Sequence, residues 1–151
     1  MQIIDKRVED LIPYENNPRI NDGAVDAVAA SISRFGWKVP LVIDKNNVVV
    51  TGHTRLKAAK ALGLDTVPCI LADDLSEEQV RAFRLVDNKT GELAGWDFSK
   101  LQSELAMIEG IKMEDFGFLL AEIGKFKEEV KAEHEAKRIC CPRCGEIVGV
   151  E

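Results

Sequence analysis

The sequence has no long hydrophobic run and few aromatic residues, and its basic residues are outnumbered by acidic ones. No apolar stretch approaches the roughly 18 to 20 residues that a membrane-spanning helix needs, and the first residues lack the apolar core of a signal peptide. The 20 Lys and Arg residues stand against 26 Asp and Glu residues, which excludes a uniformly basic nucleic-acid coat. We therefore expect a cytoplasmic protein without membrane contact, in which any DNA contact uses a local patch.

Cysteine is also scarce and unevenly placed. Cys140, Cys141 and Cys144 lie within the last dozen residues, while Cys69 stands alone. Such a distribution cannot form a disulfide framework across the fold. Cys69 lies in an apolar strand pattern, which favours a small core residue over a reactive one.

Apolar and charged residues are plentiful, at 46% and 30% of the 151 residues. This balance is typical of one globular domain with a real hydrophobic core and a short appendage.

The first half of the chain alternates strand and helix patterns. Short apolar runs at 3–4, 41–43, 48–50 and 67–71 predict strands, and an Asn-containing connection makes a hairpin of the second and third. Helices are predicted at 22–36, at 53–63 and from a capping box at Ser76 toward Lys89. The apolar stripe of the first helix should face the core. The order of these elements indicates an α+β fold, with a small mixed sheet packed against helices.

The second half is predicted to be helical. Asp97 is a helix cap, and the apolar faces of two helices are predicted at Phe98, Leu101, Leu105 and Ile108, and at Phe116, Leu119, Leu120 and Ile123. Trp96 is expected to anchor this half. We expect a domain at 1–95, a helical extension packing on it at 96–124, a charged helix or linker at 125–139 and a tail at 140–151.

The segment most informative of function is the junction between a strand and a helix at Gly52-His53-Thr54-Arg55. Glycine lets the backbone approach a ligand closely, and the start of a helix supplies unpaired N–H groups. Arg55 adds a fork of donors that suits phosphate oxygens. The pattern predicts an anion cradle, but an ordinary strand-to-helix turn has the same ingredients, so both interpretations stay open.

An ordered set of motifs resembles the N-terminal domain of ParB proteins. The motifs are Asn17-Pro18-Arg19, Gly36-Trp37-Lys38-Val39-Pro40, Gly52-His53-Thr54-Arg55 and Asp87-Asn88-Lys89, and together they cover residues 1–95. The stretch 92–97 and Phe116-Gly117-Phe118 extend the resemblance to about residue 124, in the form found in phages, in prophages and beside DNA methyltransferases. The resemblance implies the fold shared by ParB and sulfiredoxin.

The resemblance also implies a function. ParB proteins grip the triphosphate of CTP with their Gly-x-x-Arg segment, so this chain would bind CTP or another nucleoside triphosphate with Mg²⁺. It would be associated with DNA binding, segregation or modification in a phage or mobile element, with nucleotide, DNA or a DNA-modifying protein as partners and with homodimer formation left open. The implied nucleotide-binding residues are Arg19, Gly36, Pro40, Gly52, His53, Thr54, Arg55 and Lys89. The implied Mg²⁺ ligands are Asp87 and Asn88, which offer the oxygen atoms that Mg²⁺ prefers.

Departures from the family pattern keep two alternatives open. Thr54 stands where ParB proteins usually have a positive residue, and Thr90-Gly91 replaces a common Arg, so triphosphate affinity and base choice are open. One alternative is a phosphoryl-transfer enzyme or a ParB-like nuclease that uses the same pocket. It would be at most a slow NTPase or a nuclease, and its catalytic residues are unassigned. The other is an adaptor with an empty pocket. Sulfiredoxin activity is not expected, because His53 and Thr54 occupy the place of its reactive cysteine.

Some side chains also have plain structural interpretations. His53 at a helix start could be a polar surface residue, although its neighbours favour the phosphate site. Arg81 and Arg84 lie one turn apart and could contact DNA, although a solvated charged face is expected.

The tail contains Cys141-Pro142-Arg143-Cys144-Gly145, which has the form of a zinc knuckle. A closed zinc site needs four ligands, so Cys141 and Cys144 make only half of one. Cys140, His134 or a partner chain would complete it, and a metal-free knuckle is the alternative.

Overall fold

The computed structural model describes residues 2–118, 138–140 and 147–149. The chain divides into two compact units, residues 1–95 and residues 96–151. In the part of the chain that is described, no helix is both long and apolar enough to cross a membrane.

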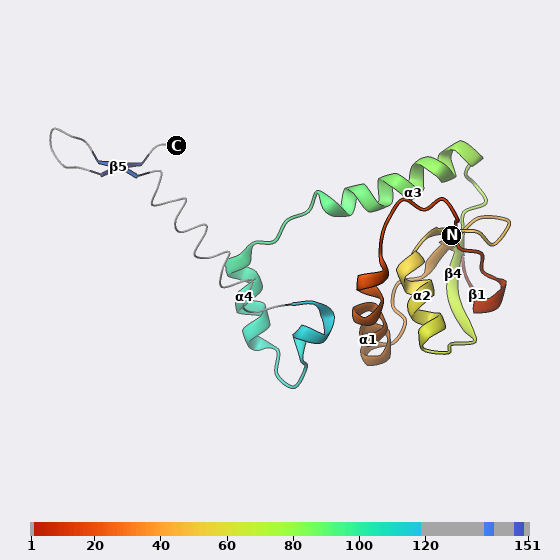
Figure 1. Cartoon of the computed structure of the whole chain (residues 1–151), viewed down its shortest axis with the longest axis horizontal. Coiled ribbons are helices and arrows are strands. Elements are labelled where there is room, and N and C mark those ends of the chain that lie inside the picture. The colour runs from red at the N-terminus through yellow and green to blue at the C-terminus, as the bar shows by residue number, and fades with distance from the viewer. Residues whose placement is uncertain (1, 119–137, 141–146, 150–151) are drawn as a thin grey trace. The chain divides into compact units, whose positions relative to one another are not determined.

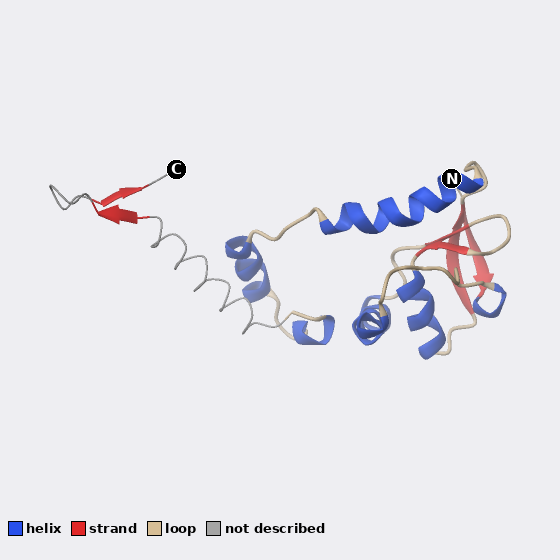
Figure 2. Ribbon diagram, turned by 45° about the horizontal axis from the view of Figure 1, so that its top comes forward, coloured by secondary structure: helices blue, strands red, loops and turns tan. Residues whose placement is uncertain are grey.

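A four-stranded mixed sheet is the centre of the first unit (Figure 2). The strands are β1 (Ile3–Arg7), β2 (Leu41–Ile43), β3 (Val49–Thr51) and β4 (Thr66–Leu71), in the order β1-β4-β2-β3. β4 and β2 run parallel, and the two outer pairings are antiparallel. This sheet and the helices around it confirm the predicted α+β class.

The predicted hairpin of β2 and β3 is confirmed. Its turn is closed by the carboxylate of Asp44, which accepts hydrogen bonds from the backbone N–H groups of Asn46 and Val48 at 2.8 and 2.9 Å. Asn47 takes a positive φ of 60°, a conformation that asparagine tolerates better than most residues. A bulge between Val42 and Ile43 shifts the register of the pair.

The hydrophobic core lies between the sheet and α2 (His53–Ala61). Leu56 and Ala59 of this helix are buried against strand side chains. The strand residues of the cluster are Leu41, Ile43, Val49, Val67 and Cys69. Burial raises the pKa of the Cys69 thiol to about 11, so Cys69 is the core residue that its strand pattern predicted.

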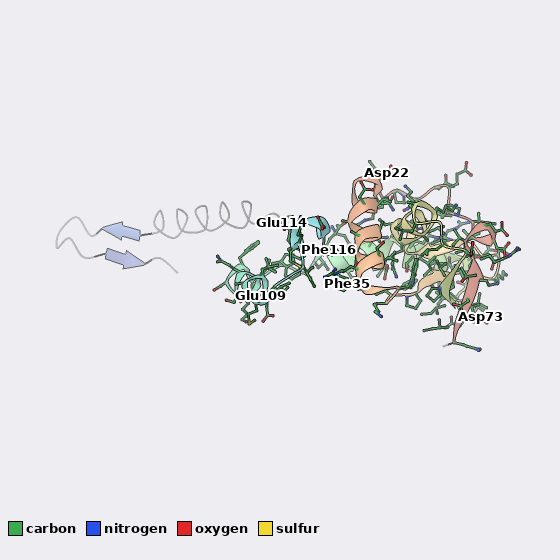
Figure 3. The ribbon with its side chains drawn as sticks, turned by 90° about the horizontal axis from the view of Figure 1, so that it is seen from below. Asp22, Phe35, Asp73, Glu109, Glu114 and Phe116 are labelled. Atoms are coloured by element: carbon green, nitrogen blue, oxygen red, sulfur yellow. The ribbon has the colours of Figure 1, made fainter. Side chains whose placement is uncertain are left out.

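Helix α1 (Val25–Phe35) lies beside α2 (Figure 1). It follows a short 3₁₀ turn, η2 (Asp22–Ala24), and ends at Gly36, where φ is 74° and the N–H donates to the carbonyl of Ile32 at 2.8 Å. Figure 3 labels Asp22 and Phe35 at the two ends of this stretch. The apolar stripe of α1 was expected to face the core, but its residues are at most partly buried. No residue of α1 is fully buried, because α2 supplies the helical side of the core and α1 packs on α2 instead.

Helix α3 (Glu77–Glu92) begins with the predicted capping box. The Ser76 side chain accepts from the Gln79 N–H, and the Gln79 side chain accepts from the Ser76 N–H. Val80 and Arg84 form its buried positions, and the helix contacts β3. The prediction that Arg84 belongs to a solvated face is therefore wrong, whereas Arg81 is exposed as expected.

In the second unit, Asp97 caps α4 (Phe98–Met107) by accepting from the Lys100 N–H, as predicted. The rings of Trp96 and Phe118 meet edge to face, with centroids 6.0 Å apart. Phe116 ends a 3₁₀ turn, η3 (Met113–Phe116), instead of starting a predicted α-helix. Leu119, Leu120 and Ile123 of that predicted helix lie outside the described residues.

The last described elements are the antiparallel strands β5 (Arg138–Cys140) and β6 (Ile147–Gly149). The predicted charged helix or linker therefore does not include its last two residues, which belong to β5. The rest of that segment lies outside the described residues, and so do Cys141 and Cys144.

Gly52 and Gly63 allow a test of packing at the turn before α2. Both have positive φ, 97° and 65°, but a Cβ on Gly52 would lie 2.5 Å from Leu41 Cδ2, while a Cβ on Gly63 meets nothing within 4 Å. Gly63→Ala should cost about 1–2 kcal/mol from backbone strain alone. Gly52→Ala should cost about 1–3 kcal/mol more, because the core must also shift. Urea unfolding followed by circular dichroism measures both, and equal losses would contradict the packing argument.

Candidate functional site

The candidate site begins at the turn between β3 and α2. Gly52 is left-handed, and the space beside it is taken by Leu41 and Arg55. No side chain caps the start of α2. The first amides of the helix consequently have no partner within it and are suited to an anion.

Arg55 joins this turn to the segment that follows α1. Its Nη1 donates to the carbonyl oxygens of Val39 and Pro40, the latter at 2.7 Å. The Nη2 atom lies on the side of Gly52, 3.3 Å from where a Cβ would stand. One guanidinium therefore bridges the two predicted motifs, 36–40 and 52–55.

The electrostatic surroundings of Arg55 include a carboxylate on α3. Burial of the half-exposed side chain lowers the pKa of Arg55, and the Asp87 carboxylate opposes that shift. Asp87 is thus placed to act on the same region as the turn amides.

Asp87 and Asn88 offer oxygen atoms to a cation. Asn88 Nδ2 donates to the Arg84 carbonyl at 2.7 Å, which orients Oδ1 as the remaining acceptor of that amide. Within residues 2–118, no three His, Cys, Asp or Glu side chains gather as a metal-binding group. The chemistry of Asp87 and Asn88 fits Mg²⁺, whose other ligands would be phosphate and water oxygens.

Arg19 and Lys89 meet at a carboxylate that the sequence analysis missed. Arg19 Nη1 is 3.1 Å from Glu92 Oε1, and Lys89 Nζ is 3.0 Å from Glu92 Oε2. The hydrogen bond from Lys89 is the main cause that lowers the pKa of Glu92. Arg19, Asn88, Lys89 and Glu92 line a cavity of about 570 Å³ between residues 17–20 and α3. The spacing of Lys89 and Glu92, three residues apart on a helix, is the signal that could have found this pair.

His53 has a different partner from the one its motif predicts. Its Nε2 accepts the backbone N–H of Tyr14 at 3.3 Å, and the side chain is half-buried. Burial lowers the pKa of His53, and the nearby cations Arg84 and Lys57 lower it further. His53 also lines a cavity of about 210 Å³ with Arg19 and Lys57.

The predicted residues therefore fall into groups. Pro40, Gly52 and Arg55 form one contact group, while Arg19, Asn88 and Lys89 surround one cavity. Gly36 ends α1, and Thr54 is half-buried in the first turn of α2. The ligand-binding roles of all these residues stay predictions.

Arg84 and Tyr14 were not predicted to belong to the site. The Arg84 guanidinium lies over the Tyr14 ring, with Cζ 3.9 Å from its centroid. A usable signal was present, because Val80 and Arg84 are four residues apart and lie on one helix face.

Residues 2–89 match the family model described as the ParB N-terminal domain. The chain belongs to this family. It is 35% identical over 80 residues to the ParB-like nuclease domain-containing protein YnaK of Escherichia coli, over 52% of this chain and 92% of YnaK. It is 32% identical over 79 residues to the probable chromosome-partitioning protein ParB of Campylobacter jejuni, over 50% of this chain but only 28% of that protein.

A solved ParB structure has the same fold. The C-terminally truncated chromosome-partitioning protein ParB from Caulobacter crescentus, complexed with CTP-gamma-S, aligns with a TM-score of 0.62 at 20% identity. The alignment covers 76% of this chain and 68% of that one. The ParB-like fold predicted from the motifs is thereby confirmed.

The bridge made by Arg55 leads to a prediction about the segment 36–40. Arg55→Ala removes two charge-assisted hydrogen bonds to that segment, so its amides should exchange faster with solvent, by roughly tenfold. Hydrogen exchange measured by NMR on the ligand-free protein tests this. Arg81→Ala, which removes an exposed arginine from α3, should leave exchange at 36–40 unchanged. Equal exchange in the wild type and Arg55→Ala would contradict the bridge.

Proposed function

We propose that residues 1–95 form a module that binds a nucleoside triphosphate, CTP or another NTP, together with Mg²⁺. The observation that carries this proposal is the Arg55 bridge. Arg55 ties the backbone of the 36–40 segment to the turn whose helix amides suit phosphate. The family resemblance implies that segment 36–40 walls the base while the 52–55 turn holds the phosphates, so one nucleotide would join the two segments.

The other residues have roles consistent with this ligand. Asp87 and Asn88 would hold the Mg²⁺ ion, which would neutralise phosphate charge when bound. Arg19 and Lys89 would supply positive charge at the cavity that they line together with Asn88. The fold shared with Caulobacter crescentus ParB, which was solved with CTP-gamma-S, supports CTP as the first nucleotide to test.

We propose further that the module works with machinery that binds, segregates or modifies DNA in a phage or mobile element. The name of the Campylobacter jejuni relative, a probable chromosome-partitioning protein, supports the link to DNA. Its partners would be DNA or a DNA-modifying protein, and a second copy of the chain is another candidate.

A second function, nucleic-acid cleavage, is favoured by the name of YnaK, a ParB-like nuclease domain-containing protein. Incubation with Mg²⁺ and either nucleotide or DNA, followed over time for products, separates turnover from binding. Product formation that is lost in the Asp87→Asn variant would favour an enzyme. Stable binding without product would favour a module that binds its ligand without turnover.

Calorimetric titration with CTP, ATP, GTP and ADP, with and without Mg²⁺, tests the main proposal. We expect one nucleotide to bind selectively, and Arg55→Ala to weaken its affinity by about tenfold or more, because a charge-assisted contact is lost. Arg81→Ala is the matched control and should bind like the wild type. Failure of every nucleotide to bind in the presence of Mg²⁺ would reject the proposal and leave the adaptor with an empty pocket.

We also propose that Cys141 and Cys144 bind Zn²⁺. The antiparallel pairing of β5 and β6, with Cys140 opposite Ile147, supports this because those strands flank the two cysteines in the sequence. Two thiolates per chain predict about one Zn²⁺ per two chains if a second copy completes the four ligands. Metal analysis of anaerobically purified protein measures this ratio. Zinc should be lost in the Cys141→Ser, Cys144→Ser variant, and its absence from the wild type would end the idea.

A further inference from the structure

Arg84 is a buried cation that joins three separate segments. Its side chain is only 10% exposed. The guanidinium stacks on the ring of Tyr14, its Nε donates to the Val49 carbonyl at 3.4 Å, and its Nη2 lies 4.0 Å from the Asp44 carboxylate. A charge this deeply buried is retained only when its neighbours compensate its lost hydration. Here the aromatic face contributes much of that compensation, because the two polar contacts are long.

Tyr14 links Arg84 to the turn between β3 and α2, residues 52–55, which is the phosphate-binding turn of the proposed function. Its backbone N–H donates to Nε2 of His53, the first residue of α2. A neutral histidine that accepts at Nε2 must carry its proton on Nδ1. A protonated His53 would have a donor at Nε2 and could not accept from Tyr14.

The same segment carries Arg19. Residues 14–21, here named the anchored segment, form no helix or strand. One end is held by the two contacts of Tyr14. The other end is held by Lys57, whose Nζ lies 2.9 Å from Asn21 Oδ1 and 2.6 Å from Asp22 Oδ1. Arg19 lies between these ends, so its position depends on both.

The charges around His53 favour its neutral form. Arg84 faces it from α3, and Lys57 and Lys60 from its own helix. Glu15 and Arg19 of the anchored segment line the same cavity. Asp22 adds a second carboxylate through its ion pair with Lys57, but the cations still outnumber the carboxylates. The excess of positive charge agrees with the acceptor role that the hydrogen bond shows.

We propose that Arg84, Tyr14 and His53 act as positioning residues that hold the anchored segment, and with it Arg19, against the phosphate-binding turn. His53 serves there as a neutral acceptor of a backbone N–H and not as a cationic ligand of phosphate. The inference takes its ligand from the proposed nucleotide function, but the contacts themselves exist without ligand and are tested separately.

The first test needs no nucleotide. The chain has two histidines, so a His134→Gln variant leaves His53 as the single imidazole signal. Nitrogen-15 NMR should show the Nδ1–H tautomer near pH 7 and a titration midpoint below the ordinary value of 6.5. In that background Arg84→Met should raise the midpoint, because a nearby cation is removed. The Nε2–H tautomer, or a midpoint above 6.5, would overturn the proposal.

A conservative pair at position 14 covers the case in which Arg84→Met does not fold. Tyr14→Phe retains the aromatic face over Arg84 and should preserve both the tautomer and the midpoint. Tyr14→Leu removes that face and should raise the His53 midpoint as the segment loosens. Identical titrations for Phe and Leu would show that the stack does not position His53.

The second test uses nucleotide affinity. Gln at position 53 can accept the Tyr14 N–H through Oε1, whereas Lys places a cation there. The positioning role predicts that His53→Lys weakens binding more than His53→Gln, by about fivefold. The reverse order would show that His53 binds phosphate as a cation and would overturn the assignment. If the wild type binds no nucleotide, the proposed function fails, while the tautomer and midpoint still decide whether these residues position the segment.

Discussion

The hydrogen bonds from Arg55 to the carbonyl oxygens of Val39 and Pro40 are the constraint on which the candidate site depends. They are made across a turn that only glycine fits, because Gly52 is left-handed and packed against Leu41. The core below the turn is formed by the sheet and α2, so the position of Arg55 is set by the best-packed part of the unit. Arg55 holds the 36–40 segment and the 52–55 turn in fixed positions relative to each other. A ligand that contacts one of them therefore meets the other already in place.

Three other cations near the site have partners within the protein. Glu92 forms one ion pair with Arg19 and one with Lys89, whereas the ring of Tyr14 covers the buried Arg84. The two ion pairs of Glu92 are exposed and weak, since water and salt screen them. An incoming triphosphate would compete with a carboxylate for the same cations, and Mg²⁺ would reduce the repulsion between the two anions. If the proposed nucleotide binds, this competition would link its binding to the position of the segment that carries Arg19.

Much of the fold could be predicted from the sequence, because its local signals are strong. The capping box at Ser76, the Asn-containing hairpin turn and the strand-to-helix glycine all appear where the residues indicate. The motif order was also enough to identify the family. What could not be predicted is how distant segments share their partners. An arginine in a charged helix reads as solvated, and only its contact with Tyr14, 70 positions earlier, reveals that Arg84 is buried. The prediction that α1 faces the core was wrong for a related reason. Periodicity identifies an apolar face but not the element that covers it.

The proposed function requires that one ligand engages the 36–40 segment and the 52–55 turn together. Backbone amide NMR of the nitrogen-15-labelled protein, titrated with CTP-gamma-S and Mg²⁺, tests it most directly. We expect the amides of both segments to shift along one saturable curve with a common dissociation constant. Shifts confined to the turn would mean an anion site without a base subsite, and an unchanged spectrum would contradict nucleotide binding altogether.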